Sequence, residues 1–197
     1  NGEKMILYNE KLKPILNDLE NPQIELAGGS TVGMILSIIN SLICYICNLT
    51  IGKANYEKVQ DEVIKIKEQT INLKERMLYT IDQDKIVLEK ILKAYKVKKS
   101  NPEMLESASK ESVIFCKNVM DNAVETLELT KKIANVGNKM LASDFEIAKL
   151  YAFSSIEACV VNIEVNLKLV QDAEFVRKIR NEYKTSVANA RNLMKNF

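Results

Sequence analysis

The sequence predicts an all-α fold, a bundle of about six to seven helices around a central apolar helix, in a single domain over residues 1–197. The chain contains only 6 Gly and 3 Pro in 197 residues, well below the average usage of about 7% and 5%. Residues 26–52 contain no charged side chain. No segment alternates apolar and polar residues with the period of two that a half-buried strand requires. Long helices with few turns are therefore favoured over sheets.

The elements can be placed in chain order from turn residues and apolar spacing. A short amphipathic helix over about 4–19 is expected to end at the Asn21-Pro22 turn. The uncharged stretch then forms a buried helix over about 30–49, because a helix that is apolar on all sides belongs inside a bundle. The remaining helices are predicted over about 53–79, 81–96, 102–133, 143–171 and 173–195.

Four signals set the boundaries of these later helices. The string TIDQ at 80–83 resembles a capping box that opens the helix of 81–96, and SDFE at 143–146 is a clearer one for the helix of 143–171. Pro102 suits the first turn of a helix, where its missing N–H costs nothing. Gly137 interrupts the helical pattern before the second capping box. Together they separate the long charged segments into individual helices.

The helix of about 53–79 has an apolar seam along one side. Its members follow each other in alternating steps of three and four: Tyr56, Val59, Val63, Ile66, Thr70, Leu73 and Met77. This is the a/d spacing of a coiled coil, so we expect the helix to pack along one partner for its whole length. With the apolar central helix, the seam offers more apolar face than one chain readily covers, which predicts a homodimer.

The composition excludes several functions. The chain has no His and no Trp, so a His-based triad and His-ligated zinc are impossible, and no metal site is predicted. With 28 basic and 26 acidic residues the net charge is +2, and without a basic block neither nucleic acid nor a membrane surface is an expected partner.

The four cysteines lie within apolar helical patterns. They are Cys44, Cys47, Cys116 and Cys159. This placement favours core packing in a reducing cytoplasm over a disulfide scaffold. The first two form a C-x-x-C without a second pair, and small-residue packing is the preferred interpretation over a redox or metal role.

The uncharged stretch is long enough to be considered as a transmembrane helix. It carries Ser37, Asn40, Ser41 and Asn48, each of which is costly in lipid unless paired. It also begins too late, after a charged segment, for an N-terminal signal peptide. A buried helix of a soluble bundle is therefore the preferred interpretation.

A stripe of small and polar residues follows one side of this central helix. Gly33, Ser37, Ser41, Cys44 and Asn48 are spaced by four, four, three and four residues. One interpretation is close helix packing, with hydroxyls bonded to carbonyls of their own helix. The other is that the stripe forms the floor of a binding cleft. Sequence alone leaves both open.

Two further polar features suggest a ligand site. The helix start at Gly28, Gly29 and Ser30 leaves backbone N–H groups and the positive end of the helix dipole available to an anion, although an ordinary N-cap explains it as well. Asn162 and Asn166 lie one turn apart on an apolar helix and must be hydrogen-bonded if buried. They indicate a polar network, a subunit contact or a ligand.

Five segments match a known pattern in order. The residues of AGGSTVG followed by TIGK resemble a Pro-Gly-Gly-Gly-Ser start and a later Thr-x-Gly-Lys segment. IDQDKIVLEKILKAYKVKK resembles an acidic pair followed by Ala-x-x-Leu-Pro-Lys, VGNKMLASDFEIAK a Gly-Asn…Ser-Asp segment, and VVNIEVNLKLVQD an Asn-x-x-x-Asn with a later Asp. Over about residues 5–175 the chain thus resembles the cyclodeaminase/cyclohydrolase family, which includes the C-terminal domain of formiminotransferase-cyclodeaminase and free-standing bacterial relatives.

The resemblance carries over to named residues. It implies the catalytic residues Asp84, Asp144 and Lys99, and the substrate-binding residues Gly28, Gly29, Ser30, Asn138, Ser143, Asn162 and Asn166. We expect one ligand cleft to join the start at Gly28–Ser30 to Asp84, Lys99, Asn138 and Asp144. The chain departs from the family pattern at Leu26, Ala27, Lys98 and Lys110, which replace a Pro, a Gly, a Pro and an Arg.

The resemblance also implies an activity. Family members act at the N5/N10 bridge of tetrahydrofolate, either closing 5-formiminotetrahydrofolate to 5,10-methenyltetrahydrofolate with loss of ammonia or hydrolysing the methenyl compound to 10-formyltetrahydrofolate. The resemblance further implies a cytoplasmic homodimer that takes a folate substrate and needs no tightly bound cofactor. A catalytically impaired family member that serves as a helical binding or assembly module is the alternative.

Overall fold

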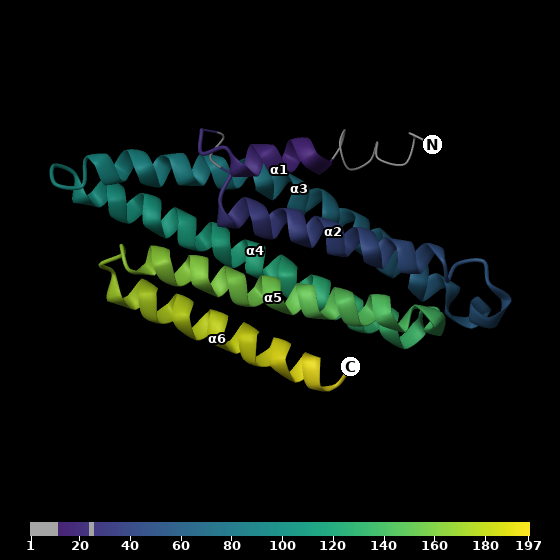
Figure 1. The fold of residues 1–197 in the computed structure, drawn as a ribbon. Helices are drawn as coiled ribbons and strands as arrows, with labels where there is room; N and C mark the ends of the chain where they lie inside the picture. The colour runs from purple at the N-terminus through teal and green to yellow at the C-terminus, as the bar shows by residue number, and fades with distance from the viewer. Residues whose placement is uncertain (1–11, 24–25) are drawn as a thin grey trace.

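The computed structural model describes residues 12–23 and 26–197. Within these ranges the regular elements are all helices and there is no strand, which confirms the all-α prediction (Figure 1). The helices are α1 (Lys13–Glu20), α2 (Gly28–Asn48), α3 (Gln60–Lys96), α4 (Pro102–Val136), α5 (Ala142–Leu167) and α6 (Ala173–Lys195). Two short 3-10 helices, η3 (Ala54–Val59) and η4 (Lys139–Leu141), lie in the connections before α3 and α5.

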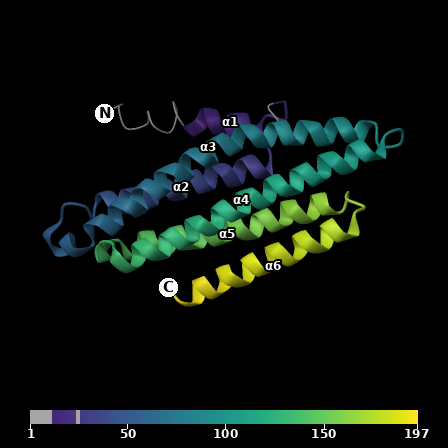
Figure 2. The same ribbon diagram turned by 180° about the vertical axis from the view of Figure 1, so that it is seen from behind.

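Helices α2 to α6 run alternately up and down the bundle (Figure 1). α2 packs against α3, α4 and α5, and α6 packs against α4 and α5. The hairpin of α3 and α4 extends well past the point where α2 begins, as both views show (Figures 1 and 2). The N-terminus of α2 therefore opens partway along the bundle, beside the middle of its neighbours.

The predicted break at 80–81 is wrong, and the capping role predicted for Ser143 is not seen, although α5 does begin within one residue of its predicted start. α3 is one continuous helix of 37 residues, and the Thr80 hydroxyl donates to the Arg76 carbonyl (2.9 Å) instead of capping a new helix. α5 begins at Ala142 after Leu141, which makes no side-chain cap bond, so the SDFE string lies inside the first turn. The first helix begins at Lys13 in the described residues, and the part predicted over 4–11 lies outside them.

The apolar seam of the long helix is buried within the chain. Val63, Ile66, Thr70, Leu73 and Met77 are all at most 2% exposed. α3 packs on both α2 and α4, so the expectation of a single partner along its whole length is wrong. The seam is covered without a second copy, and it gives no reason for dimerisation.

The central helix is α2, as predicted, with one open side. Its residues facing the other helices are buried, whereas Ile38 and Tyr45 are 66% and 52% exposed. By length and composition α2 could cross a membrane, yet 56% of its most apolar window is buried within the bundle. Three of the four free cysteines are buried and Cys44 is half-buried, which agrees with the packing interpretation.

Small residues allow α2 to approach α3 closely. A side chain at Gly33 would place its Cβ 3.1 Å from the Met77 carbonyl oxygen. The Ser37 hydroxyl donates to the Gly33 carbonyl (2.8 Å), and Ser41 donates to the Ser37 carbonyl (2.9 Å). These bonds within the helix are what the packing interpretation of the polar stripe predicts.

Candidate functional site

The open N-terminus of α2 is capped by a carboxylate from α3. Ala27, at the N-cap position, makes no side-chain cap bond. Instead Asp84 Oδ2 accepts a hydrogen bond from the Ser30 backbone N–H (2.7 Å). The Ser30 hydroxyl lies 2.9 Å from the same oxygen and 3.2 Å from the Ile81 carbonyl. A negative charge at this end of a helix is favoured by its dipole.

The two glycines make room for this arrangement. A Cβ on Gly29 would lie 2.0 Å from Asp84 Oδ1, a distance that no real contact allows. A Cβ on Gly28 would lie 3.5 Å from the Asn162 side-chain oxygen, an ordinary contact distance. Gly28 therefore faces α5, Gly29 faces α3, and the predicted residues Gly28, Gly29, Ser30, Asp84 and Asn162 do come together.

A thiol from α4 completes the surroundings of Asp84. Burial, together with the negative charge of Asp84, raises the pKa of Cys116 to about 12. Cys159 on α5 is 1% exposed, and burial and the neighbouring Cys116 raise its pKa as well. Both thiols stay protonated at neutral pH, so neither is an activated nucleophile. The apolar helical spacing around Cys116 predicts a core position and gives no sign that this residue borders the site.

Asn166 and Lys99 lie at the same end of the bundle as Asp84, but further toward its tip. The Asn166 amide donates to the Asn162 backbone carbonyl (2.9 Å), which orients it along α5. Lys99 is exposed in the turn between α3 and α4. Since Asp84 is twelve residues before the end of α3 at Lys96, Lys99 lies about 18 Å or more from Asp84 along the helix axis.

Asn138 belongs to the opposite end of the bundle. Its backbone N–H donates to the Thr50 hydroxyl (3.0 Å), and its side-chain amide donates to the Leu49 carbonyl (3.3 Å). Its side-chain oxygen accepts from the Met140 N–H (3.1 Å) and caps η4. Thr50 follows the C-terminal end of α2, whereas Ser30 lies at its start. The two ends are about 30 Å apart for a helix of 21 residues.

Ser143 and Asp144 lie in the first turn of α5, next to η4. They therefore share the end of the bundle that Asn138 occupies. Within one chain, the expectation of a single cleft joining Asp144 and Asn138 to Asp84 and Ser30 is wrong. The physical reason is that antiparallel helices place the start of α5 beside the end of α2, a full helix length from its N-terminus.

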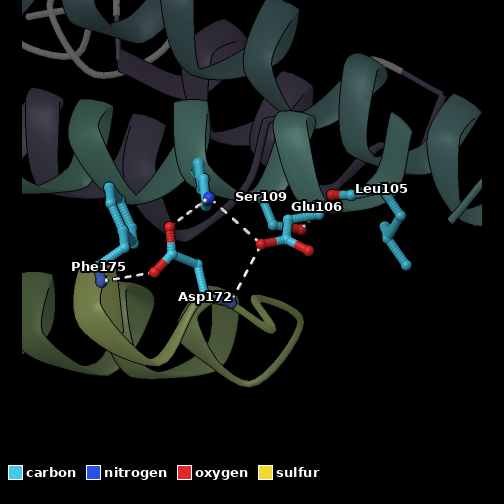
Figure 3. Close-up of polar contacts among 6 residues, drawn as sticks. Leu105, Glu106, Ser109, Asp172 and Phe175 are labelled. Carbon is cyan, nitrogen blue, oxygen red and sulfur yellow. Dashed lines mark hydrogen bonds and ion pairs between the residues drawn. The ribbon is translucent and has the colours of Figure 1, made fainter. Parts of the chain in front are cut away.

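Two residues singled out by the resemblance, Lys110 on α4 and Asp172 at the start of α6, form an ion pair; Figure 3 shows the surroundings of Asp172. Lys110 Nζ lies 2.9 Å from Asp172 Oδ2 and 3.3 Å from Glu106 Oε1. Asp172 also accepts from the Phe175 N–H (3.0 Å) and so caps α6. The N–H bond from Phe175 and the Lys110 ammonium lower the pKa of Asp172. Lys110, which stands where the family has Arg, thus ties α6 to α4.

A surface groove of about 590 Å³ lies between the end of α5 and α6. It is lined by basic residues of α6, namely Arg177, Arg180 and Lys184, over apolar residues such as Leu167 and Val170. It contains none of the predicted site residues. The candidate site is therefore the polar cluster around Asp84, defined by hydrogen bonds, and not this groove.

Comparison with known proteins gives three matches. A family model described as formiminotransferase-cyclodeaminase matches residues 11–185. A methenyltetrahydrofolate cyclohydrolase from Methylorubrum extorquens is 24% identical over 189 residues, covering 92% of this chain and 91% of its own. The crystal structure of formiminotetrahydrofolate cyclodeaminase from Thermotoga maritima superposes with a TM-score of 0.88 at 24% identity, covering 96% and 94% of the two chains.

Proposed function

The chain belongs to the formiminotransferase-cyclodeaminase family, and we propose that it is a folate one-carbon enzyme acting at the N5/N10 bridge of tetrahydrofolate. Its relative from Methylorubrum extorquens is named a methenyltetrahydrofolate cyclohydrolase, and the similar structure is that of a formiminotetrahydrofolate cyclodeaminase. Both names describe chemistry at the same bridging carbon. The proposed activity is therefore cyclisation of the formimino compound with loss of ammonia, or hydrolysis of the methenyl compound.

Both reactions need a group that moves protons. In the cyclodeaminase reaction N10 attacks the formimino carbon, and the resulting amino group must be protonated before ammonia leaves. In the cyclohydrolase reaction water adds to the methenyl carbon and loses a proton, and N5 gains one as its bond to that carbon breaks. A carboxylate within hydrogen-bond reach of this carbon can accept and return these protons without His.

Asp84 is the proposed acid/base. The observation that carries this role is the pair of Ser30 donors, the backbone N–H and the hydroxyl, that hold Asp84 Oδ2 at the start of α2. Asp84 Oδ1 packs where a Cβ of residue 29 would lie, so the glycine lets the carboxylate approach the backbone of α2. A carboxylate fixed in this way is oriented before substrate arrives, which lowers the cost of reaching the reactive geometry.

The other predicted residues take supporting roles in the proposal. Because the Ser30 N–H already donates to Asp84, Gly28–Ser30 are proposed to position this carboxylate more than to bind a substrate anion. The side-chain amides of Asn162 and Asn166 on α5 are proposed to form hydrogen bonds with the pterin or with the N5/N10 bridge. Lys99 is proposed to pair with the carboxylates of the glutamyl tail. This tail extends away from the pterin, and Lys99 in the α3–α4 turn is correspondingly far from Asp84.

Asp144 is the second candidate carboxylate, with Ser143 and Asn138 beside it. In one chain it lies about 30 Å from Asp84, so it would serve the same site only from a second copy. The side chain and the backbone N–H of Asn138 together make four hydrogen bonds. One is with Thr50, and the others are with residues of the connections next to it. These bonds favour a structural role for Asn138 over a substrate-binding role.

We also propose a cytoplasmic homodimer without a tightly bound cofactor. Four free thiols suit a reducing compartment. The proposed reaction needs no cofactor, because the substrate itself carries the one-carbon unit as an iminium-like electrophile. The dimer is what the family resemblance implies.

One assay tests the activity. Methenyltetrahydrofolate absorbance is followed with purified protein, started once from 5-formiminotetrahydrofolate and once from 5,10-methenyltetrahydrofolate. A rise from the first substrate supports the cyclodeaminase, and an accelerated fall from the second supports the cyclohydrolase. No change over the uncatalysed rate from either substrate contradicts the proposal and favours the assembly module.

A further inference from the structure

A groove follows the contact between α5 and α6. The hollow of about 590 Å³ at the end of α5 reaches Lys184, which also lines a second hollow of about 330 Å³ that extends to Arg191. From Arg177 to Arg191 the groove follows α6 for about 21 Å. Both hollows are open to solvent. A segment of a partner chain therefore fits this shape better than a small molecule, which a pocket encloses on most sides.

The floor of the groove is apolar and recessed. At the end of α5 it is formed by Leu167 and Val170, which are 2% and 9% exposed, beside Val176 of α6. Further along α6 it continues with Val160 and Val187. Only apolar groups that enter the groove can reach these side chains. A membrane surface does not meet this condition, because an interfacial helix binds lipid through apolar side chains that protrude from it.

The α6 side of the groove is basic. Four of its lining residues are positively charged: Arg177, Arg180, Lys184 and Arg191. Two of them already have partners on α5, because Arg180 pairs with Glu164 (2.8 Å) and Arg191 with Glu157 (3.0 Å). Within the part of the chain that the structure describes, the other two form no ion pair. Four basic groups against two acidic ones leave the groove with an excess of positive charge.

We propose that this groove binds an acidic amphipathic helix of a partner protein. Arg177 and Lys184 are two helical turns apart on α6, which is about 10 Å. Two carboxylates seven residues apart on a partner helix have the same spacing. Apolar side chains three and four residues after the first carboxylate lie on the same face and point to the apolar floor. A helix that lays such a face in a groove is a recurring mode of recognition.

The charge of the groove selects this class of partner. A basic helix would meet Arg177 and Lys184 with like charge, which disfavours binding. Nucleic acid would satisfy the charge but not the floor, and base stacking needs accessible aromatic rings. Tyr183, the one aromatic residue that lines the groove in the described ranges, is 8% exposed. The proposal does not rest on the folate activity, because the groove contains no residue of the candidate site, and its test uses no folate.

The test is the fluorescence anisotropy of a labelled probe helix, titrated with the full chain. The probe is an Ala-rich peptide with Glu at every seventh position and Leu three and four positions after each Glu, and a second peptide carries Gln in place of Glu. Arg177→Gln/Lys184→Gln removes the two unpaired charges of the groove. Lys178→Gln/Lys195→Gln is the matched control, because both residues are exposed on α6 outside the groove and the same net charge is lost. Circular dichroism measures the helix content of each protein.

We expect saturable binding of the Glu peptide to the natural chain and to Lys178→Gln/Lys195→Gln. The Kd should rise about 10-fold in Arg177→Gln/Lys184→Gln, as for the loss of two exposed charge pairs. The Gln peptide should bind the natural chain about 10-fold more weakly than the Glu peptide, and this comparison needs no variant to fold.

Three results would overturn the proposal. The first is no saturable binding of the Glu peptide to the natural chain, as when a second copy covers the groove. The second is an equal loss in both double variants, which would reflect the overall charge of α6 and not the groove. The third is binding of anionic vesicles or of an RNA oligonucleotide that Arg177→Gln/Lys184→Gln abolishes, which would assign the groove to another class of partner.

Discussion

Gly29 is the residue on which the geometry of Asp84 depends most directly. A methyl group there would lie 2.0 Å from Asp84 Oδ1, so Gly29→Ala must displace the carboxylate or separate α2 from α3. We expect the free energy of unfolding to fall by about 1–3 kcal/mol, as in other overpacked sites, and turnover to fall with it. Urea unfolding and the methenyl absorbance assay measure the two effects.

Gly28→Ala is the matched control for this change. It adds the same methyl group one residue earlier, where the nearest side chain is at 3.5 Å. Ala also favours a helix over Gly by up to about 1 kcal/mol. Unfolding free energy should therefore stay the same or rise. Equal damage in both variants would mean that the glycines serve the backbone of the helix start and not the position of Asp84.

Replacement by Asn at each position distinguishes the proposed roles of Asp84 and Asp144 in catalysis. Asp84→Asn keeps the shape of the side chain but removes its ability to exchange a proton, which typically lowers the rate about 100- to 10,000-fold. Asp144→Asn changes a first-turn residue about 30 Å away in the same chain, and we expect turnover within about threefold of normal. Turnover is measured by the absorbance assay, and loss of activity in Asp144→Asn alone would move the acid/base role to Asp144.

At the scale of elements, both ends of α2 are held by other parts of the chain. At the C-terminal end the fully buried Thr50 hydroxyl donates to the Ile46 carbonyl (2.8 Å) and accepts from the Asn138 N–H (3.0 Å). Thr50→Val leaves that buried N–H without a partner, which should cost about 1–3 kcal/mol of unfolding free energy. Urea unfolding measures this loss.

Thr185→Val serves as the control for Thr50→Val. The Thr185 hydroxyl donates to the Asn181 carbonyl of its own helix (2.9 Å) at an exposed site. Water can replace that bond, so stability should change by less than about 0.5 kcal/mol. If Thr50→Val is equally mild, the link between the end of α2 and Asn138 contributes little to the fold.

The contact between α5 and α6 should respond to acid. Arg180 donates two hydrogen bonds to Glu164 (2.9 and 2.8 Å), and the Tyr183 hydroxyl donates a third (2.6 Å). The bonds from Arg180, with that from Tyr183, lower the pKa of Glu164 from 4.5 to about 2. A carboxyl with a lowered folded pKa stabilises the fold above its unfolded pKa, and this contribution disappears as pH falls toward the folded value.

Stability should therefore fall between about pH 4.5 and pH 2, partly through Glu164. Thermal melts at pH 5, 4 and 3 compare the natural chain with Glu164→Gln, whose melting temperature should depend less steeply on pH. Glu128→Gln removes an exposed carboxyl on α4 and should keep the slope of the natural chain. Parallel slopes in all three proteins would contradict a special role for Glu164.

Element boundaries show where local sequence is sufficient. Asn101 before Pro102 caps α4 through the Met104 N–H, and Asp172 caps α6 through the Phe175 N–H; at both places a turn precedes the helix. The TIDQ string has the same chemistry but no chain-breaking residue before it, and the helix continues. A capping box marks a helix start only where the preceding backbone leaves the helical path.

For the whole molecule, the sequence predicted the fold class and the burial of the central helix, because both follow from periodicity. Periodicity tells which side of a helix is buried but not how far one helix slides along another. That α2 begins beside Asp84, or that Asp144 lies at the other end, depends on this offset. The apolar spacing of α3 likewise indicated a seam without showing that α2 and α4 cover it, so the seam gives no reason to expect a dimer.

The cap of α2 comes from a side chain of α3, and this determines when the site can form during synthesis of the chain. The first turn of α2 takes its cap from a residue 54 positions later, and Gly28 meets Asn162 only when α5 exists. Consecutive helices can pair as they leave the ribosome, since their contacts close short loops. The surroundings of Asp84, however, stay incomplete until nearly the whole bundle has been translated, so a truncated nascent chain would hold helices without a finished site.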